Sequence, residues 1–357
     1  MQHNLYRVQI VGATGYGGLG LIEQLMRHPN IELTSLLAKT DTGMPLSKIF
    51  PHLTGFCDHI VEEVQDERIG ENADLVVFAT PDRVAMNYAA ALIQRGIKVI
   101  DYSGDFRFSD LAVYNRYAAR KPGIGGKPHQ TPELLKQSMY GVPELFREKL
   151  QNASLVGNPG CFAITIELAL APALRAGILN PQSIIVDGKT GASGGGKKPS
   201  TVSHFPEQSE NVLPYRVANH QHSAEAEDVL TRVSGSPVGI TFVPHQVPTS
   251  RGIECACFGQ LKGEISPEEI QEIYRKAYAH EPFVRVLPPG IAPGPKAVRG
   301  SNLCDISLFV DQANNRLVII SSADNLLKGQ AGTALQNINL MLGLEETTGI
   351  NRVPLYP

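Results

Sequence analysis

One cysteine of the 357-residue chain stands where a catalytic nucleophile is expected. Cys161 follows Pro159 and Gly160 in the run GNPGCFAI, and an apolar pattern with helical spacing begins at the cysteine itself. A thiol on the first turn of a helix lies beside N–H groups that have no intrahelical acceptor, which lowers its pKa and stabilises an oxyanion nearby. Most free cysteines are inert and buried, so this stretch alone leaves a nucleophile and a packing residue equally open.

The other four cysteines show no such setting. Cys255 and Cys257 fall on one face of an expected strand, and Cys57 and Cys304 have neither a basic residue nor a glycine loop beside them. The total of five is odd and no C-x-x-C pair is present. We therefore expect packing roles for these four, without disulfides or structural zinc.

A thiolate nucleophile usually works with a base, and the run NHQHSAE supplies His220 and His222 just before an expected helix. No third ligand stands at a plausible spacing for a metal, so acid–base chemistry is the better interpretation. Arg107 in DYSGDFRF, and His245 and Arg251 in FVPHQVPTSRG, suit a phosphate or carboxylate substrate, because a guanidinium binds such groups through two hydrogen bonds. Each arginine is also open to a purely structural ion pair.

Two glycine-rich runs point to bound phosphates. Gly12, Gly15 and Gly18 have the spacing G-x-x-G-x-x-G between an expected strand and an amphipathic helix, which is typical of a turn that cradles a pyrophosphate. After the second strand comes Lys39, which favours the 2′-phosphate of NADP, with Asp41 keeping NAD as an alternative. A second cluster, KTGASGGGKK at 189–198, is suited to phosphate or is a surface loop.

These residues need elements to position them, and the first hundred residues alternate strand and helix signals. Strand patterns occur at 5–12, 31–39, 73–81 and 96–104, and a helix pattern occurs at 19–28. This alternation predicts a parallel sheet of the Rossmann type, and thus an α/β fold. Residues 111–147 lack sustained periodicity, which predicts an irregular connection with short helices.

The character of the chain changes after a helix expected at 161–174. Strand patterns separated by Gly and Pro loops occur at 183–191, 240–247 and 252–261, and a hairpin is expected at 304–322 with its turn at Asn314 and Asn315. One helix, 266–280, carries a capping-box signature. This block predicts an α+β domain with a mostly antiparallel sheet.

Composition limits the function classes. The chain is 42% hydrophobic and 19% charged, with a formal net charge of −3, so it lacks the basic excess of nucleic-acid binders. We expect no membrane partner, because no apolar run reaches the length of a spanning helix, and the cytoplasm is the expected location, because the polar start does not look like a signal peptide. The length favours two domains.

The quoted motifs, with GVPEL, ENVLPYRVANHQH and DNLLKGQAGTALQNINLMLG, make the chain similar to the N-acetyl-gamma-glutamyl-phosphate reductases of arginine biosynthesis, in order from about residue 6 to 350. The resemblance implies an NADP-binding Rossmann domain at 1–155 that is completed by a C-terminal helix at 325–357. It implies a catalytic and oligomerisation domain at 156–324, and a homo-oligomer, commonly a tetramer. The chain departs from the family pattern at Ile164 and Thr333, where threonine and glutamine are usual.

The resemblance also implies the reaction and the site. NADPH would reduce the acyl phosphate to N-acetylglutamate semialdehyde and phosphate through a thioester on Cys161, with His220 in acid–base catalysis and no metal. The cofactor residues that it implies are Gly12, Thr14, Gly15, Tyr16, Gly17, Gly18, Lys39, Thr80, Pro81, Ser103, Ser193, Gly194 and Asn325. The substrate residues that it implies are Arg107, Asn158, His222, His245 and Arg251.

Three alternatives remain open at this point. The acyl group could be aminoadipyl, on a carrier protein or free, as in lysine biosynthesis. An aspartate-semialdehyde dehydrogenase shares the first glycine loop, but the H-x-H run and GNPGCF argue against it. A non-catalytic NADP-binding redox sensor would need neither the cysteine nor the paired histidines.

Overall fold

The computed structural model describes residues 5–108, 110–350 and 353–356. The chain divides into two compact units, each made of separate segments. The first unit comprises Met1–Tyr114, Lys127–Pro159 and Gln330–Ile350. The second unit comprises Asn115–Gly126, Gly160–Gly329 and Asn351–Pro357.

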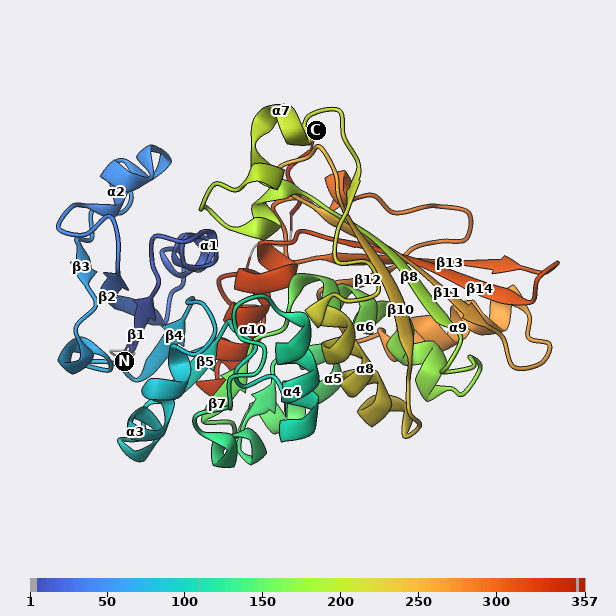
Figure 1. Ribbon diagram of the computed structural model, residues 1–357, viewed down its shortest axis with the longest axis horizontal. Helices are drawn as coiled ribbons and strands as arrows, with labels where there is room; N and C mark the ends of the chain where they lie inside the picture. The colour runs from blue at the N-terminus through green and yellow to red at the C-terminus, as the bar shows by residue number, and fades with distance from the viewer. Residues whose placement is uncertain (1–4, 109, 351–352, 357) are drawn as a thin grey trace. The chain divides into compact units, whose positions relative to one another are not determined.

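The first unit is built on a seven-stranded parallel sheet in the order β3-β2-β1-β4-β5-β7-β6 (Figure 1). Its strands are β1 (Tyr6–Val11), β2 (Ile31–Ala38), β3 (Val61–Glu63), β4 (Leu75–Phe78), β5 (Lys98–Asp101), β6 (Met139–Tyr140) and β7 (Leu155–Gly157). Every residue of β4 is buried, which explains its unbroken apolar run. The predicted Rossmann-type sheet is confirmed, and its strand order reverses beside β1, where such sheets form a ligand crevice.

Helices of the first unit cover this sheet. They are α1 (Tyr16–Leu25), α2 (Leu46–Ile49), α3 (Ala89–Gln94), α5 (Pro143–Leu150) and α10 (Gly332–Met341). All ten residues of α10 are buried, and the helix packs on α1, α5 and β5. Although α10 lies late in the sequence, it is therefore part of the core of the first unit.

The region 111–147 is more regular than its sequence suggested. It contains α4 (Leu111–Arg120) as well as part of α5. Tyr114 and Tyr117 of α4 are fully buried. These two rings are spaced three residues apart and anchor one helix face.

The second unit has a seven-stranded mixed sheet in the order β12-β13-β14-β11-β8-β10-β9 (Figure 1). Its strands are β8 (Ile184–Thr190), β9 (Leu213–Pro214), β10 (Ile240–Gln246), β11 (Ile253–Gln260), β12 (Val284–Val286), β13 (Cys304–Asp311) and β14 (Arg316–Ala323). Only β8–β10 and β12–β13 pair in parallel, so the sheet is mostly antiparallel, as predicted. The predicted hairpin is β13–β14, and Asn315 in its turn has a φ of 48°.

One face of the second sheet is covered by helices. The helices of this unit are α6 (Cys161–Arg175), α7 (Phe205–Gln208), α8 (Gln221–Ser234) and α9 (Pro267–Ala277). α6 packs on β11 and β14, α8 on β10, and α9 on β13. Residues of β11 alternate between buried and half-buried, which places Cys255 and Cys257 toward the helices and leaves Phe258 on the open face. Cys57, Cys255, Cys257 and Cys304 are all buried, which confirms their packing role.

The longest helix in the described part of the chain is α6, with 15 residues. It matches the predicted helix closely and contains Pro172 near its end. Among the described residues, no helix has both the length and the apolar composition needed to cross a membrane.

Candidate active site

The glycine loop of the first unit is tightly built. Gly12 follows β1 with a φ of +94°, and a side chain there would collide with the carbonyl of Ala79. A side chain at Gly18, in the first turn of α1, would collide with the carbonyl of Gly12. The chain therefore requires glycine at both positions, and the first turn of α1 comes against the loop backbone, as in a pyrophosphate cradle.

The other expected cofactor residues of this unit lie at the same edge of the sheet. The last residue of β1, Val11, pairs with β2 and β4, and Phe78 of β4 pairs with Asp101 of β5. The loops after these strands carry the exposed Lys39, the pair Thr80 and Pro81, and Ser103. All of them follow the carboxyl ends of parallel strands, which is where such sheets bind ligands.

The hydroxyls of Thr80 and Ser103, both at this edge, differ in their hydrogen bonding. The Thr80 Oγ1 atom is buried and has no hydrogen-bond partner among the described residues, so it is a suitable contact for a bound ligand. The Ser103 hydroxyl donates to Asp101 at 2.6 Å and accepts the Asp105 N–H, so it holds its own loop. Burial raises the pKa of both Asp101 and Asp105, and the negative charge of Asp82 adds to both rises. The charge of Asp101 raises the pKa of Asp105 further.

Arg107 and Asn158 are both buried in the first unit and bind protein groups. Arg107 donates from Nε to the Asn158 carbonyl at 2.8 Å and from a terminal nitrogen to the Tyr102 carbonyl at 2.7 Å. The Asn158 amide donates to the Gln330 carbonyl and accepts from Asn337. These contacts anchor the GNPG turn, so both residues hold the backbone that leads to Cys161, and their contact with substrate stays a prediction.

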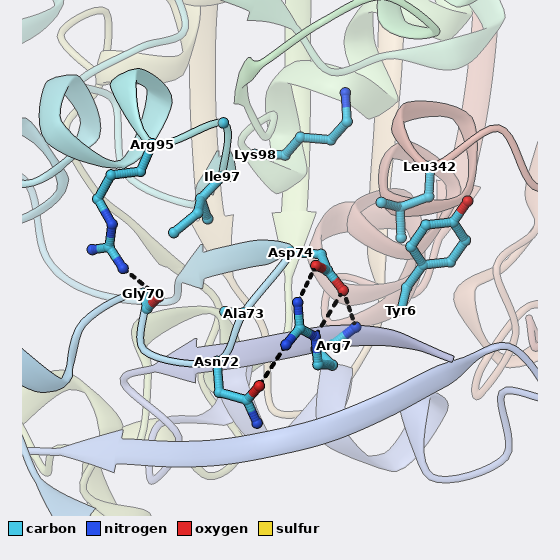
Figure 2. Close-up of a pocket in the computed structure, with 11 residues that line it drawn as sticks. Tyr6, Arg7, Gly70, Asn72, Ala73, Asp74, Arg95, Ile97, Lys98 and Leu342 are labelled. Carbon is cyan, nitrogen blue, oxygen red and sulfur yellow. Dashed lines mark hydrogen bonds and ion pairs between the residues drawn. The ribbon is translucent and has the colours of Figure 1, made fainter. Parts of the chain in front are cut away.

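A pocket of about 500 Å³ lies at the opposite, amino edge of this sheet (Figure 2). Figure 2 shows Arg7 bound to Asp74 and Asn72, and Arg95 bound to the Gly70 carbonyl. Its arginines therefore already have protein partners. None of the cofactor, catalytic or substrate residues expected from the sequence lines it.

In the second unit, Cys161 is the first residue of α6, with Gly160 as the N-cap. The thiol is the one cysteine among the described residues that is not fully buried. The N–H groups of the first turn have no intrahelical acceptor, and the positive end of the helix stabilises negative charge on the sulfur. Ile164 is fully buried, so an apolar side chain fits there, while the Thr165 hydroxyl donates to the Cys161 carbonyl.

The first predicted histidine, His220, is the N-cap of α8. Its Nδ1 atom accepts the backbone N–H of His222 at 3.2 Å. A backbone N–H can only donate, so Nδ1 carries no proton and the neutral ring holds its proton on Nε2. In this arrangement, His220 offers an N–H donor and not a basic nitrogen.

Aromatic rings enclose His220. Its ring centroid lies 5.6 Å from that of Tyr215, 5.9 Å from Phe162 and 5.3 Å from Phe242. Burial, followed by the positive charges of Arg216 and Lys121, lowers the pKa of His220 to about 3. The imidazole is therefore neutral at physiological pH, which is also the state in which Nδ1 is able to accept the cap hydrogen bond.

His222 lies directly against the N-cap of α6. A side chain at Gly160 would collide with the His222 ring, and the His220 and His222 ring centroids are 4.7 Å apart. The buried Glu225, one helical turn after His222, accepts the Gly160 N–H at 2.8 Å. Cys161, His220 and His222 are thus brought together, and Glu225 positions the backbone before the nucleophile.

Sequence reasoning missed Glu225. The available signal was its spacing of three residues from His222 in an expected helix, which places both side chains on one face. Within the described residues, no three His, Cys, Asp or Glu side chains are grouped so that they could hold a metal ion.

A loop cluster in the second unit gathers further predicted residues. Asn325 donates to the Ser193 hydroxyl at 2.9 Å and accepts the Gly252 N–H, and Gly194 lies beside the same amide. Arg251 forms an ion pair with the buried Asp324 at 3.2 Å. The Asp324 carbonyl in turn accepts the N–H of Gly329.

Gly329 connects this cluster to the nucleophile. A side chain on Gly329 would lie 2.6 Å from the Cys161 Cβ atom. The loops that carry Ser193, Arg251 and Asn325 are therefore held close to Cys161 through Asp324 and Gly329.

His245 lies apart from this group. On β10, Phe242 faces α6, with its ring centroid 5.0 Å from that of Phe162. His245 is three positions further along the strand, so it points to the open face. There its Nδ1 lies 3.1 Å from Asp187. The sheet separates it from Cys161 and His220.

Two family models match the chain in tandem. The model described as the semialdehyde dehydrogenase NAD binding domain matches residues 7–153. The model described as the semialdehyde dehydrogenase dimerisation domain matches residues 161–325.

Full-length relatives are more specific. The chain is 43% identical over 351 residues to the N-acetyl-gamma-glutamyl-phosphate reductase of Bacillus mycoides, covering 98% of this chain and 100% of that protein. The chain belongs to the N-acetyl-gamma-glutamyl-phosphate reductase family. The reductase of the same name from Bacillus cereus strain B4264 is 41% identical over 350 residues, with 98% and 99% coverage.

Solved structures support the fold of this reductase family member. Aspartate semialdehyde dehydrogenase II of Vibrio cholerae, complexed with ASA, matches with a TM-score of 0.71 at 17% identity, over 95% of this chain and 99% of that chain. The Candida albicans aspartate semialdehyde dehydrogenase with NADP matches with a TM-score of 0.66 at 15% identity, over 95% and 99%. At this identity the likeness concerns the fold alone.

The lowered pKa of His220 predicts a pH effect on stability. Below its ordinary pKa of 6.5 the unfolded chain binds a proton that the native ring does not, so the free energy of unfolding falls as pH drops toward 3. His220→Asn keeps a capping acceptor but does not titrate. Urea denaturation measures the free energy of unfolding at each pH. Between pH 6.5 and 5, this free energy should fall by on the order of 2 kcal/mol more in the wild type than in the variant. Equal losses in the two proteins would contradict the assignment.

Proposed function

We propose that this protein catalyses the reduction of N-acetyl-gamma-glutamyl phosphate by NADPH, giving N-acetylglutamate semialdehyde and phosphate in arginine biosynthesis. The observation that carries the proposal is Cys161 at the start of α6 beside the neutral His220, in a chain 43% identical to a reductase of this name. We also propose the cytoplasm as its location, since the substrate is an intermediate of amino-acid synthesis.

The first chemical step is acyl transfer to Cys161. Its thiolate attacks the acyl carbon, the bond from that carbon to the phosphate oxygen breaks, and phosphate leaves with the electron pair. The first-turn N–H groups of α6 and the Nε2–H of His220 are the donors proposed for the oxyanion that forms on the carbonyl. Glu225 holds the Gly160 N–H, and with it the backbone that carries the sulfur.

The second step converts the thioester to the aldehyde. The dihydronicotinamide cofactor, when bound, supplies the hydride for this reduction. The carbon–sulfur bond then breaks, which releases the semialdehyde and regenerates the Cys161 thiolate. The Nε2–H of His220 is again proposed to donate a hydrogen bond to the oxyanion of this stage, because Nδ1 is held by the helix cap. Collapse of that oxyanion expels the thiolate, so His220 keeps its proton throughout.

The residues of the first unit fit a dinucleotide. Gly12 and Gly18 leave no room for a Cβ atom beside the loop backbone, and the buried Thr80 hydroxyl has no partner in the described part of the protein. We propose that the run from Gly12 to Gly18, including Thr14, Tyr16 and Gly17, holds the pyrophosphate, with Thr80, Pro81 and the Ser103 loop at the same edge. Ser193, Gly194 and Asn325 are also proposed as cofactor residues, because the resemblance to the reductase family implies this role for them. Lys39 is proposed to bind the 2′-phosphate of NADP.

Cys161→Ser should lower turnover roughly a thousandfold or more while NADPH binding stays normal, because serine is a far weaker nucleophile. The assay follows NADP reduction with N-acetylglutamate semialdehyde and phosphate, set beside the aspartate and aminoadipate analogues. Cys57→Ser, at a buried cysteine that has no part in the proposed chemistry, is the matched control. A Cys161→Ser enzyme with wild-type turnover would exclude the thioester route, and a preference for another semialdehyde would correct the substrate.

Lys39→Gln should raise the Kd for NADPH roughly tenfold and leave that for NADH nearly unchanged, because only NADPH carries the phosphate that the ammonium binds. Fluorescence titration of both nucleotides measures the ratio. Lys276→Gln on α9 is the control. If Lys39→Gln weakens both nucleotides equally, Lys39 does not select NADP.

We further propose that the open face of the second sheet joins two copies of the chain within a homo-oligomer, with a tetramer as the full assembly. Ile185, Phe258, Val318 and Phe309 form one cross-strand row on this face through their pairings. The match to a dimerisation-domain model over residues 161–325 supports this choice of unit. A paired apolar row would leave water on association, which is favourable.

Phe258→Lys should dissociate the oligomer, since a lysine in the middle of the row would bury an unpaired charge. Sedimentation velocity at micromolar concentration measures the change in mass. Phe56→Lys, at an exposed phenylalanine of the first unit, should leave the assembly intact. An unchanged sedimentation coefficient for Phe258→Lys would place the interface elsewhere.

A further inference from the structure

The segment before His220 presents a positive charge that neither the sequence motifs nor the relatives assign. We propose that Arg216, together with Lys121, forms a binding site for an oxyanion of the substrate beside His220. The oxyanion is either the phosphate or a carboxylate. This inference rests on the proposed function for the identity of the substrate, but the presence of the anion site is testable without it.

The backbone around Arg216 is strained. Arg216 has a φ of 45° and Ala218 a φ of 53°, two left-handed conformations within three residues, neither of them glycine. Each is unfavourable for a residue that carries a Cβ atom and persists only where the surroundings hold it. Here the N–H groups of Tyr215 and Ala218 donate to the carbonyls of Pro244 and Phe242 on β10, at 3.0 and 2.9 Å. The sheet thus fixes the direction in which Arg216 leaves the chain.

The guanidinium of Arg216 is directed along the start of α8. One of its terminal nitrogens donates to the Gln221 side chain at 2.6 Å. Arg216 is exposed, and no Asp or Glu in the described part of the chain pairs with it. A guanidinium has five N–H donors, so most of its hydrogen-bonding capacity remains available for an anion.

Lys121 reaches the same region from a different segment. Its neighbour Arg120 donates to the Ser223 hydroxyl at 2.7 Å, and Ser223 donates to the His220 carbonyl at 2.7 Å. Lys121 itself donates to the Tyr117 hydroxyl at 2.8 Å. Two positive charges, fixed by separate contacts, therefore stand near the His220 ring.

The electrostatic effects on neighbouring groups agree with this placement. The charges of Arg216 and Lys121 add to burial in lowering the pKa of His220. Burial raises the pKa of Tyr215, negative charge on Cys161 raises it further, and Arg216 opposes the rise. Tyr215 is thus within electrostatic reach of both the nucleophile and Arg216.

The other arginines expected to bind substrate have protein partners. Arg251 is paired with the buried Asp324, and Arg107 donates to two backbone carbonyls. The formal net charge of the chain is −3, so the pair of cations near His220 is a local feature and not a general excess. A doubly charged acyl phosphate that also carries a carboxylate needs such a cation pair near the attacking thiolate.

The first test uses the charge of a thiol reagent. Cys161 is the one cysteine of the described residues that is not fully buried, so alkylation reports on it. Iodoacetate is an anion and iodoacetamide is neutral, so their rate ratio measures the local attraction for anions. In Arg216→Gln and in Lys121→Gln this ratio should fall roughly three- to tenfold, while Arg275→Gln on α9 leaves it unchanged. Arg216→Lys should restore most of it.

The second test identifies the bound group. In the reverse assay, a rise of roughly tenfold or more in the KM for phosphate alone in Arg216→Gln assigns the phosphate, and a rise in the KM for the semialdehyde alone assigns its carboxylate. Circular dichroism checks that the variants fold. If Arg216→Gln does not fold, the same comparison of KM values is made with Lys121→Gln.

The two tests separate the anion site from the proposed reaction. If the wild type does not turn over these substrates, the proposed function fails, but the alkylation ratio still decides the anion site. If the ratio is unchanged in both Arg216→Gln and Lys121→Gln, the inference is overturned, whatever the kinetics show.

Discussion

The hydrogen bond from the His222 N–H to Nδ1 of His220 determines how the proposed chemistry is divided among the side chains. It caps α8, and it fixes the proton of the neutral ring on Nε2. If Nδ1 were protonated, its N–H would face the backbone N–H of His222. Two donors would then meet, and the hydrogen bond that caps α8 would be lost. Acid–base roles that need a basic nitrogen are therefore closed to His220 in this conformation, and deprotonation of Cys161 must depend on the helix end and the nearby cations.

Local patterns predicted the parts of the fold that depend on neighbours in sequence. The glycine spacing, the helix beginning at Cys161 and the β13–β14 hairpin are set by backbone rules that operate over a few residues. Glu225 and Lys121 were missed because their relevance arises only when distant segments pack around the start of α8. Arg216 lay inside a quoted motif, but the left-handed conformation that directs it depends on β10.

Polar residues beside a motif were the hardest to assign from the sequence. Arg107 and Asn158 have the residue types of substrate ligands, but they bind carbonyls and an amide of the first unit. A buried backbone carbonyl needs a hydrogen-bond donor, and so does an oxygen of the substrate. The sequence does not show which of these two acceptors a given arginine or asparagine serves. For His245, the period of two along β10 shows that its side chain lies on the face of the strand opposite to Phe242. It does not show which of the two faces α6 covers.

The position of α10 in the chain affects the order in which the protein forms during synthesis. All ten of its residues are buried in the first unit, yet they follow Gly160–Gly329, the main segment of the second unit, in sequence. When Gly329 leaves the ribosome, the main segment of the second unit is already complete, whereas the nucleotide-binding sheet still exposes the surface that α10 will cover. The unit whose strands are synthesised first therefore closes only after the main segment of the second unit has been made, and its exposed apolar face must remain free of aggregation until then.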